Sequence, residues 1–152
     1  ILMAELYKGR RGTRGSTGYI YIVPFCICIA VGRLGCFFSG IEDQTAGIPT
    51  ALPWGHDFGD GVLRHPVQLY ESFSMLAFMV FTLLMLRNRR EIVIRYGFYL
   101  CAGFYAAQRF AWEFLKPYAA VGPLDMFQYL CLAIVFYSSF MIYRAQHAYR
   151  TA

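Results

Sequence analysis

Charged residues are scarce in this sequence: Asp, Glu, Lys and Arg make up 15% of its 152 residues, whereas 58% are hydrophobic. This composition excludes an ordinary soluble domain of the same length. A membrane-spanning helix needs about 20 mostly apolar residues, and residues 19–38, 67–86, 96–115 and 124–143 meet that requirement. The apolar residues 1–7 resemble the tail of a fifth span. We therefore predict an all-α, polytopic membrane protein whose residues 1–152 form one membrane domain.

Metal-binding and disulfide patterns are also missing. None of the five cysteines has metal-ligand spacing with a histidine, and no paired framework is visible. The cysteines are Cys26, Cys28, Cys36, Cys101 and Cys131, and all fall in the apolar segments. We interpret them as buried, small apolar side chains, apart from Cys36, which belongs to a motif described below. The sequence thus predicts neither a bound metal nor a cofactor.

A secretory signal is missing as well. The residues from Ile1 onward do not follow the basic, apolar, small-residue order of a signal peptide, and no initiator methionine precedes them. We therefore expect this sequence to be part of a longer chain whose N-terminal residues precede Ile1.

The basic residues are distributed unevenly between the loops. If the four spans alternate in direction, ten of them fall on one side: Lys8, Arg10, Arg11, Arg14, Arg87, Arg89, Arg90, Arg95, Arg144 and Arg150. The opposite loops hold only Arg64 and Lys116. Because basic loops favour the cytoplasmic side, we predict that the ten face the cytoplasm together with the C-terminus. The segment KGRRGTRG has no aromatic interleaving, so we expect no nucleic-acid partner.

Two arginines remain, and both lie within predicted spans. Charged side chains inside a membrane cost about 2.5–3.5 kcal/mol on insertion scales and usually face a bundle interior or a polar cavity. Arg33 lies near the end of its span, from which its side chain could also extend to the interface. Because Arg33 and Arg109 both lie towards the outer ends of their spans, we favour a polar cavity that they share.

Residues 39–65 form the longest stretch without a helical pattern. Glycine and proline recur in it, so we predict turns. Trp54 and Phe58 favour an ordered loop at the membrane interface, where tryptophan concentrates. Pro66 suits the first turn of a helix, so we predict that the next span begins there.

The outer ends of the spans carry further polar residues. Gln68 and Glu71 are three residues apart and share one face of a helix. Tyr105, Arg109 and Glu113 are spaced by four and line one stripe of the next span. At this spacing an Arg109–Glu113 ion pair would be satisfied within its own helix, so the stripe fits a structural role as well as a functional one.

The arginines suggest a ligand. A guanidinium matches phosphate oxygens with two parallel donors and stays charged at any working pH. Gly32 and Gly35 flank Arg33 and leave room for a ligand or a neighbouring helix close to the backbone. Two guanidiniums with this clearance predict a site for an anionic phospholipid headgroup in the outer leaflet.

Three segments resemble the motifs of one family. GRLGCFFSG resembles the G-R-x-G-N/C-F-x-N/S-G motif of the prolipoprotein diacylglyceryl transferases, RHPVQLYES resembles their R-H-P-x-Q-L-Y-E, and YAAQRFAWEFLKP is similar to their R-F-x-x-E-F-x-R/K-x-P. Order and spacing agree across residues 31–117. Members of this family are enzymes of the bacterial inner membrane, and this chain resembles their C-terminal two-thirds.

The resemblance implies an activity and a set of site residues. The family transfers a diacylglyceryl group from phosphatidylglycerol to the cysteine thiol of lipoprotein precursors, which it recognises by their signal peptides, and glycerol phosphate leaves without help from a metal or nucleotide. By resemblance Arg33 and Arg109 bind the phosphate, and Glu113 orients Arg109. The cavity would be lined by Gly35, Cys36, Gln68, Tyr70, Glu71 and Tyr105, with Arg64 and His65 at its mouth.

Some features depart from the family pattern, and alternatives stay open. The family's H-G-G motif, whose histidine is a candidate base, would precede Ile1; within this chain His65 or His56 would take that role. The second basic residue of the late motif is Lys116, which does not bind phosphate in two-pronged fashion. A non-catalytic homologue would bind anionic phospholipid or a partner's membrane helix. A small transporter or channel component would need a polar stripe through the full membrane depth.

Overall fold

The computed structural model is mostly helical, and it describes residues 7, 10, 17–118 and 122–150. Its four long helices among these residues are α2 (Ile22–Phe38), α3 (Val67–Asn88), α4 (Arg90–Glu113) and α5 (Met126–Arg150). A short 3₁₀ helix, η1 (Gly18–Tyr21), leads into α2, and another, η2 (Gly40–Asp43), follows it. Each of the four predicted spans is therefore helical. The predicted tail at residues 1–7 lies outside the described residues apart from Tyr7.

Within the described part of the chain, three helices are long and apolar enough to cross a membrane: Gly18–Phe38, Val67–Asn88 and Met126–His147. The sequence predicted a fourth at α4. This helix begins six residues before the predicted position 96, so it includes Glu91 and Arg95 near its start as well as Arg109 and Glu113 near its end. These charges lower its mean hydropathy, although α4 packs between α3 and α5.

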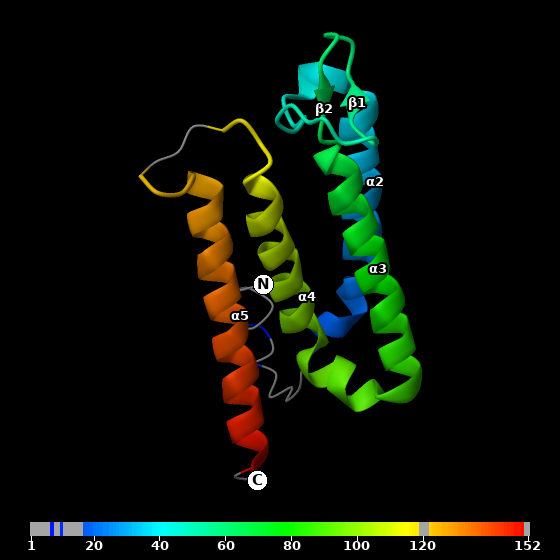
Figure 1. The fold of residues 1–152 in the computed structure, drawn as a ribbon. Coiled ribbons are helices and arrows are strands. Elements are labelled where there is room, and N and C mark those ends of the chain that lie inside the picture. Colours follow the sequence, from blue (N-terminus) through cyan, green and yellow to red (C-terminus); the bar gives the residue numbers. More distant parts are fainter. Residues whose placement is uncertain (1–6, 8–9, 11–16, 119–121, 151–152) are drawn as a thin grey trace.

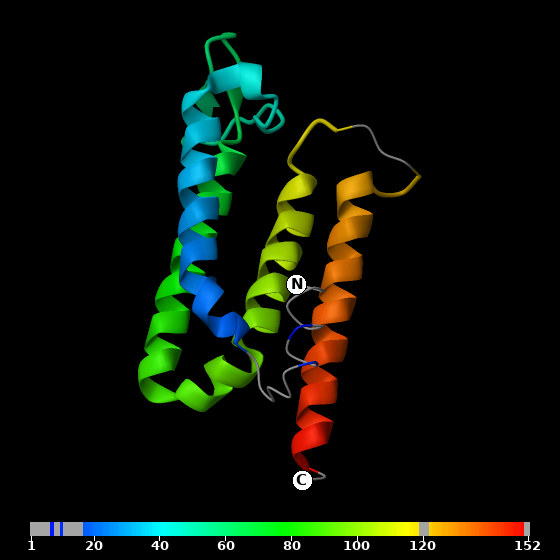
Figure 2. The same ribbon diagram turned by 180° about the vertical axis from the view of Figure 1, so that it is seen from behind.

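The helices form two antiparallel pairs, α2 with α3 and α4 with α5 (Figure 1), and the view from behind shows the same pairing (Figure 2). Contacts between α3 and α4 join the pairs. The turn at Arg89 between α3 and α4 lies at the same end of the bundle as η1 and the C-terminus. The loop between α2 and α3 lies at the opposite end, so the bundle has one basic end and one loop end.

The main cluster of buried apolar side chains lies between α2, α3 and α4. It consists of Ile22, Cys26, Met75, Val93 and Cys101. Burial of Cys26, Cys101 and Cys131 agrees with the sequence prediction, but the same prediction was wrong for Cys28, which is exposed. Two residues along an α-helix turn the chain by roughly 200°, so Cys28 faces away from the core that Cys26 enters.

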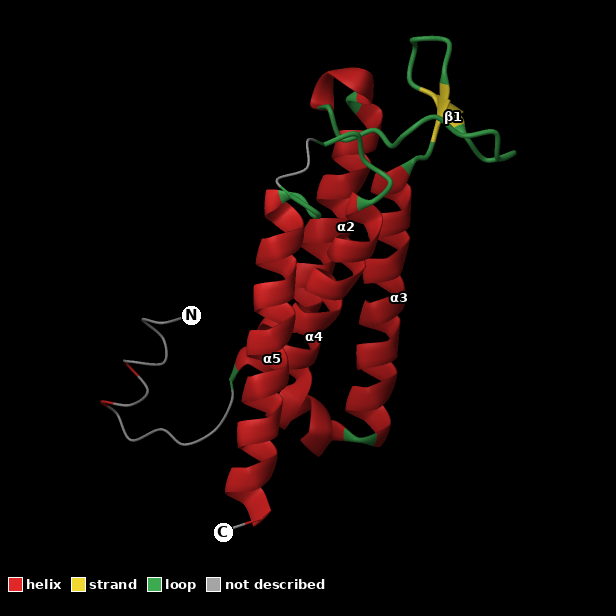
Figure 3. Ribbon diagram, turned by 60° about the vertical axis from the view of Figure 1, so that its left-hand side comes forward, coloured by secondary structure: helices red, strands yellow, loops and turns green. Residues whose placement is uncertain are grey.

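The loop at residues 39–65 is ordered around a small antiparallel hairpin (Figure 3), formed by β1 (His56–Asp57) and β2 (Leu63–Arg64). The turns predicted there are present, together with the short helix η2. The Ile48 amide donates to the Leu115 carbonyl at 2.8 Å, and the His65 amide donates to the Ile48 carbonyl at 3.1 Å. These bonds fasten the start of α3 to the chain just after α4, which is where the charged side chains gather.

Gly47 is the point at which this loop passes closest to the start of α3. A Cβ atom at Gly47 would lie 2.6 Å from the His65 carbonyl oxygen and 2.8 Å from Val67 Cγ2. We expect Gly47→Ala to lower the free energy of unfolding by about 1–3 kcal/mol, because backbone must move to admit the methyl group. Thermal unfolding in detergent measures this.

Gly32→Ala is the matched control, because a Cβ there meets nothing within 4 Å. Replacing a helical glycine by alanine favours the helix by about 1 kcal/mol, so Gly32→Ala should leave stability unchanged or raise it. If Gly47→Ala and Gly32→Ala changed the free energy of unfolding equally, the close packing at Gly47 would be contradicted.

Candidate functional site: a buried cluster of arginine, lysine and glutamate

Glu71 is the centre of a charged cluster at the loop end of the bundle. Its side chain is fully buried on α3. Arg109 Nη1 from α4 lies 3.1 Å from Glu71 Oε1 and 3.0 Å from Oε2. Lys116 Nζ, just beyond α4, lies 2.8 Å from Oε1, and Arg33 Nε from α2 pairs with Oε2. One carboxylate thus joins three cations from three segments of the chain.

A second carboxylate, Glu113, completes the cluster. Its Oε2 lies 3.2 Å from Arg109 Nε and 3.7 Å from Lys116 Nζ. The first contact is an ion pair without hydrogen-bond alignment, and the buried Oε1 has no hydrogen-bond partner among the described residues. Three cations face two carboxylates, so the cluster of Arg33, Glu71, Arg109, Glu113 and Lys116 carries one net positive charge.

The Lys116 ammonium is almost completely buried, with 1% of its side chain exposed. Burial lowers the pKa of this ammonium, and the neighbouring Glu71 carboxylate opposes the shift. Lys116 therefore depends on Glu71 to remain charged, because a buried cation without a partner is costly.

A hydrogen-bonded chain leads from α3 into the loop next to the cluster. Gln68 Nε2 donates to Thr45 Oγ1 at 3.1 Å, and Thr45 Oγ1 donates to Asp43 Oδ2 at 2.5 Å. Cys36, near the end of α2, is half-buried. Gln68 Oε1 is buried and has no partner among the described residues. The predicted shared face of Gln68 and Glu71 is thus fully buried.

Aromatic side chains flank the start of α3. The Tyr70 hydroxyl accepts from Trp54 Nε1 at 2.9 Å and lies 3.3 Å from His65 Nδ1. The Tyr70 ring packs against Trp112 of α4, with ring centroids 5.4 Å apart. His65 contacts Tyr70 through its ring and the loop through its backbone. Its imidazole therefore does not touch the charged cluster.

Arg64 lies in the hairpin, apart from the cluster. Its Nη2 lies 2.7 Å from Asp60 Oδ2, and this guanidinium lowers the pKa of the Asp60 carboxyl. Arg64 also lines a cavity of about 290 Å³ together with Gln44, Pro117 and Tyr118.

The remaining predicted residues lie at the edge of the cluster. Tyr105 packs edge-on against Phe25 of α2, with ring centroids 5.4 Å apart, so its ring belongs to the helix packing one turn below Arg109. Gly35 and Gly32 face open space, since a Cβ at either meets nothing within 4 Å. The glycines therefore leave room beside Arg33, and no neighbouring helix fills it among the described residues.

Sequence reasoning missed several members of this region. Lys116 was assigned to an outer loop, as the second basic residue of the late motif, yet it is buried between both glutamates. Thr45 and Asp43 gave no signal, because loop residues without a motif cannot be assigned to a helix face. Gln108 also went unnoticed; its Oε1 accepts from Ser74 Oγ and from Trp112 Nε1. The sequence did offer one indication of its importance, because Gln108 is a polar residue directly before Arg109 in a largely apolar helix.

The fold and this cluster together define a polytopic helical membrane protein with a charged centre buried at one end of its bundle. Three membrane-length helices and an ordered loop support that class. The particular family is shown by comparison: a model of the prolipoprotein diacylglyceryl transferases matches residues 6–144, and the chain belongs to this family.

Relatives named phosphatidylglycerol–prolipoprotein diacylglyceryl transferase support the same assignment. The chain is 32% identical to the Geobacter sulfurreducens protein over 142 residues, covering 86% of this chain and 52% of the relative. It is 34% identical to the Cupriavidus pinatubonensis protein over 139 residues, covering 83% and 49%. With the Methylococcus capsulatus protein it shares 32% identity, covering 100% and 60%. The chain thus spans about half the length of the curated relatives it matches, and no solved structure matches it significantly.

Proposed function

We propose that this protein transfers a diacylglyceryl group from phosphatidylglycerol to the cysteine thiol of a lipoprotein precursor. The observation that carries the proposal is the convergence of Arg33 and Arg109 on the buried Glu71. Glu71 holds both guanidiniums at one point, while the net positive charge of the cluster remains available for a phosphate. The names of the relatives support the substrates.

In the proposed reaction the thiol sulfur of the precursor attacks the glyceryl carbon that carries the phosphate. A carbon–sulfur bond forms, the carbon–oxygen bond to phosphate breaks, and glycerol phosphate leaves with the electron pair. Negative charge accumulates on the departing phosphate, where the guanidiniums of Arg33 and Arg109 stabilise it in a site shielded from water. Glu113 pairs with Nε of Arg109, whereas Glu71 pairs with its Nη1. The thiol proton needs an acceptor, and we keep His65 as the proposed base; because its imidazole contacts Tyr70 and not the charged cluster, the precursor thiol would have to approach the cluster from the Tyr70 side.

We also propose an orientation in the bacterial cytoplasmic membrane. Arg87, Arg89 and Arg90 lie at the turn between α3 and α4, at the same end of the bundle as the C-terminus. Because basic segments favour the cytoplasmic side, this end faces the cytoplasm and the charged cluster lies towards the outer leaflet. Phosphatidylglycerol of that leaflet and the signal peptide of an exported precursor would then meet at the cluster.

The test is an in vitro transfer assay. Purified protein is incubated with phosphatidylglycerol vesicles and a lipobox peptide, and both the peptide mass and the release of glycerol phosphate are followed. We expect a diacylglyceryl adduct on the peptide thiol, and a loss of about 100-fold or more in rate for Arg109→Ala.

Arg87→Ala is the control, because Arg87 is exposed at the basic end of α3, and it should keep the wild-type rate. If phosphatidylglycerol binds in an arginine-dependent way but no adduct forms, the chain acts as a non-catalytic lipid-binding homologue instead. Transfer that survives Arg109→Ala would remove Arg109 from the mechanism.

A further inference from the structure

Gln108 carries a hydrogen-bond donor that the folded chain does not use. Its Oε1 accepts from Ser74 Oγ at 2.5 Å and from Trp112 Nε1 at 2.9 Å. Because the indole N–H of Trp112 can only donate, the amide must present its oxygen to Trp112 and its nitrogen elsewhere. Gln108 is 8% exposed, and its Nε2 is buried without a partner among the described residues. A buried amide donor without an acceptor is rare and calls for an explanation.

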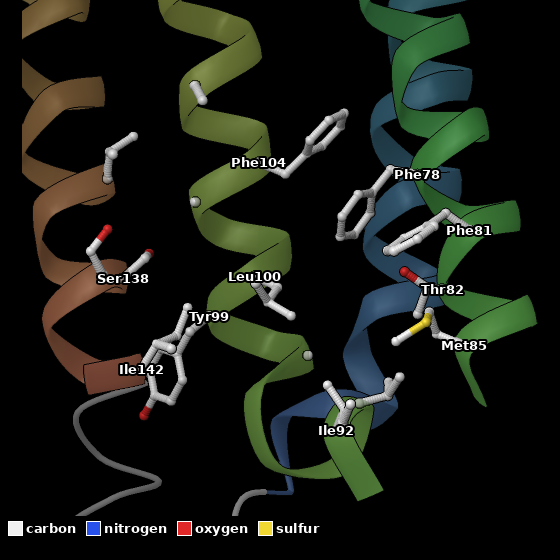
Figure 4. A pocket seen from close by; sticks show the side chains of 16 residues that line it. Phe78, Phe81, Thr82, Met85, Ile92, Tyr99, Leu100, Phe104, Ser138 and Ile142 are labelled. Carbon is white, nitrogen blue, oxygen red and sulfur yellow. The ribbon is translucent and has the colours of Figure 1, made fainter. Parts of the chain in front are cut away.

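An apolar groove of about 440 Å³ begins at Ala107, the residue before Gln108 on α4, and runs from there toward the basic end. Its walls come from α3, α4 and α5, and Figure 4 shows Phe78 of α3 and Phe104 of α4 among the lining side chains; their rings are in contact with one another and form part of the wall. Along α4 the groove extends from Ala107 to Ile92, which corresponds to roughly 22 Å at the helical rise per residue. One leaflet of a bilayer's hydrocarbon core is about 15 Å thick, so the groove is long enough for an acyl chain.

Three layers follow one another along the facing sides of α3 and α4. Arg109 meets Glu71 at the loop end, Gln108 meets Ser74 next, and Phe104 stacks on Phe78 with ring centroids 4.5 Å apart in the third layer. On α3 the residues Glu71, Ser74 and Phe78 are three and four apart, so they share one face. The chemistry along this face changes from charged to amide to apolar. A phospholipid has the same order: phosphate, ester carbonyls, acyl chains.

We propose that Gln108 Nε2 donates a hydrogen bond to an ester carbonyl of the phospholipid, and that the groove below it holds one acyl chain of that lipid. This inference rests on the proposed function, because it takes the lipid phosphate to lie at Arg33 and Arg109. It assigns Gln108 to substrate binding and makes the groove the site that selects the length and shape of the acyl chain.

The first test compares phosphatidylglycerol with its dialkyl ether analogue, which lacks both ester carbonyls. Affinities are measured by native mass spectrometry of the full chain in detergent micelles. We expect the wild type to bind the diester about threefold to tenfold more tightly, as one net hydrogen bond allows. Gln108→Leu should bind both lipids with the affinity of the ether. Gln146→Leu, an exposed glutamine of α5 near the basic end, should keep the preference.

The second test fills the groove without changing the amide. Ala107 is exposed and lines the groove, so Ala107→Phe blocks the groove without overpacking the core. We expect its affinity for dioleoyl phosphatidylglycerol to fall about fivefold or more, because several methylene groups lose their burial. Binding of dihexanoyl phosphatidylglycerol should fall less than twofold. Ala133→Phe, at an exposed position of α5 outside the groove, should change neither affinity.

The outcomes separate this inference from the proposed function. If the wild type binds diester and diether equally while Arg33→Ala still abolishes binding, the role of Gln108 is wrong and the phosphate site stands. If Ala107→Phe and Ala133→Phe behave alike, the acyl chain lies elsewhere. If phosphatidylglycerol binding does not depend on Arg33 at all, the proposed phosphate site fails, and this inference fails with it. The comparison of diester and diether binding uses the wild type alone. It therefore remains a valid test even if a variant fails to fold.

Discussion

Glu71→Ala is expected to destabilise the fold by about 3–5 kcal/mol, which is the usual cost of removing one partner from a buried ionic network. Glu71 is fully buried, accepts hydrogen bonds from Arg109 and Lys116, and forms an ion pair with Arg33. Without its carboxylate, three cations remain near one another with only Glu113 to compensate them. The free energy of unfolding in detergent, or the thermal midpoint under one fixed condition, measures the effect.

Glu113→Ala is the matched comparison for Glu71→Ala. Glu113 is equally buried, but it pairs with only two cations, Arg109 at 3.2 Å and Lys116 at 3.7 Å. We therefore expect a smaller loss of stability for Glu113→Ala than for Glu71→Ala. The double replacement of Glu71 and Lys116 should recover part of the loss, because it removes one of the uncompensated cations. Equal losses for the two glutamates would show that Glu71 is not the organising carboxylate.

Arg33→Lys is expected to reduce the proposed transfer rate by about 10²- to 10³-fold, although it keeps the positive charge. A lysine ammonium is a point charge and lacks the planar pair of donors that binds two phosphate oxygens at once. The substitution preserves an ion pair to Glu71, so the fold should remain close to wild-type stability. Single-turnover rates with the lipobox peptide, measured beside thermal unfolding, separate the two effects.

Lys116→Arg is the reverse substitution at another cation of the cluster, and it serves as the comparison for Arg33→Lys. Lys116 is 1% exposed and lies between Glu71 and Glu113, where a larger guanidinium must displace neighbours. We expect Lys116→Arg to lower the free energy of unfolding. The transfer rate of the molecules that remain folded should change much less. If Arg33→Lys kept the full rate, bidentate phosphate binding by Arg33 would be excluded.

The membrane helices and the local pairs were predictable from the sequence. A span is a run of apolar residues, and a pair such as Arg109 and Glu113 follows from helical spacing alone. The predicted start of the second span at Pro66–Val67 agrees with α3, and the predicted start of the first at residue 19 lies one residue after the start of η1, which leads into α2. The start of α4 was missed because Arg90, Glu91 and Arg95 interrupt the apolar pattern without interrupting the helix.

The tertiary structure decided which of the polar residues meet. Glu71 joins Arg109 across 38 positions and Lys116 across 45, and no local spacing encodes such contacts. They depend on the rotation of α3 against α2 and α4, which is fixed by packing of side chains such as Ile22, Met75 and Cys101. The same packing directs His65 to Tyr70 and leaves Gln108 with an unused amide donor. Local periodicity in the sequence therefore determined the helical spans and the position of Arg33 and Arg109 near one end of their helices. The carboxylate that both arginines share, and the order of side chains along α3 and α4 below it, arose only when the helices packed.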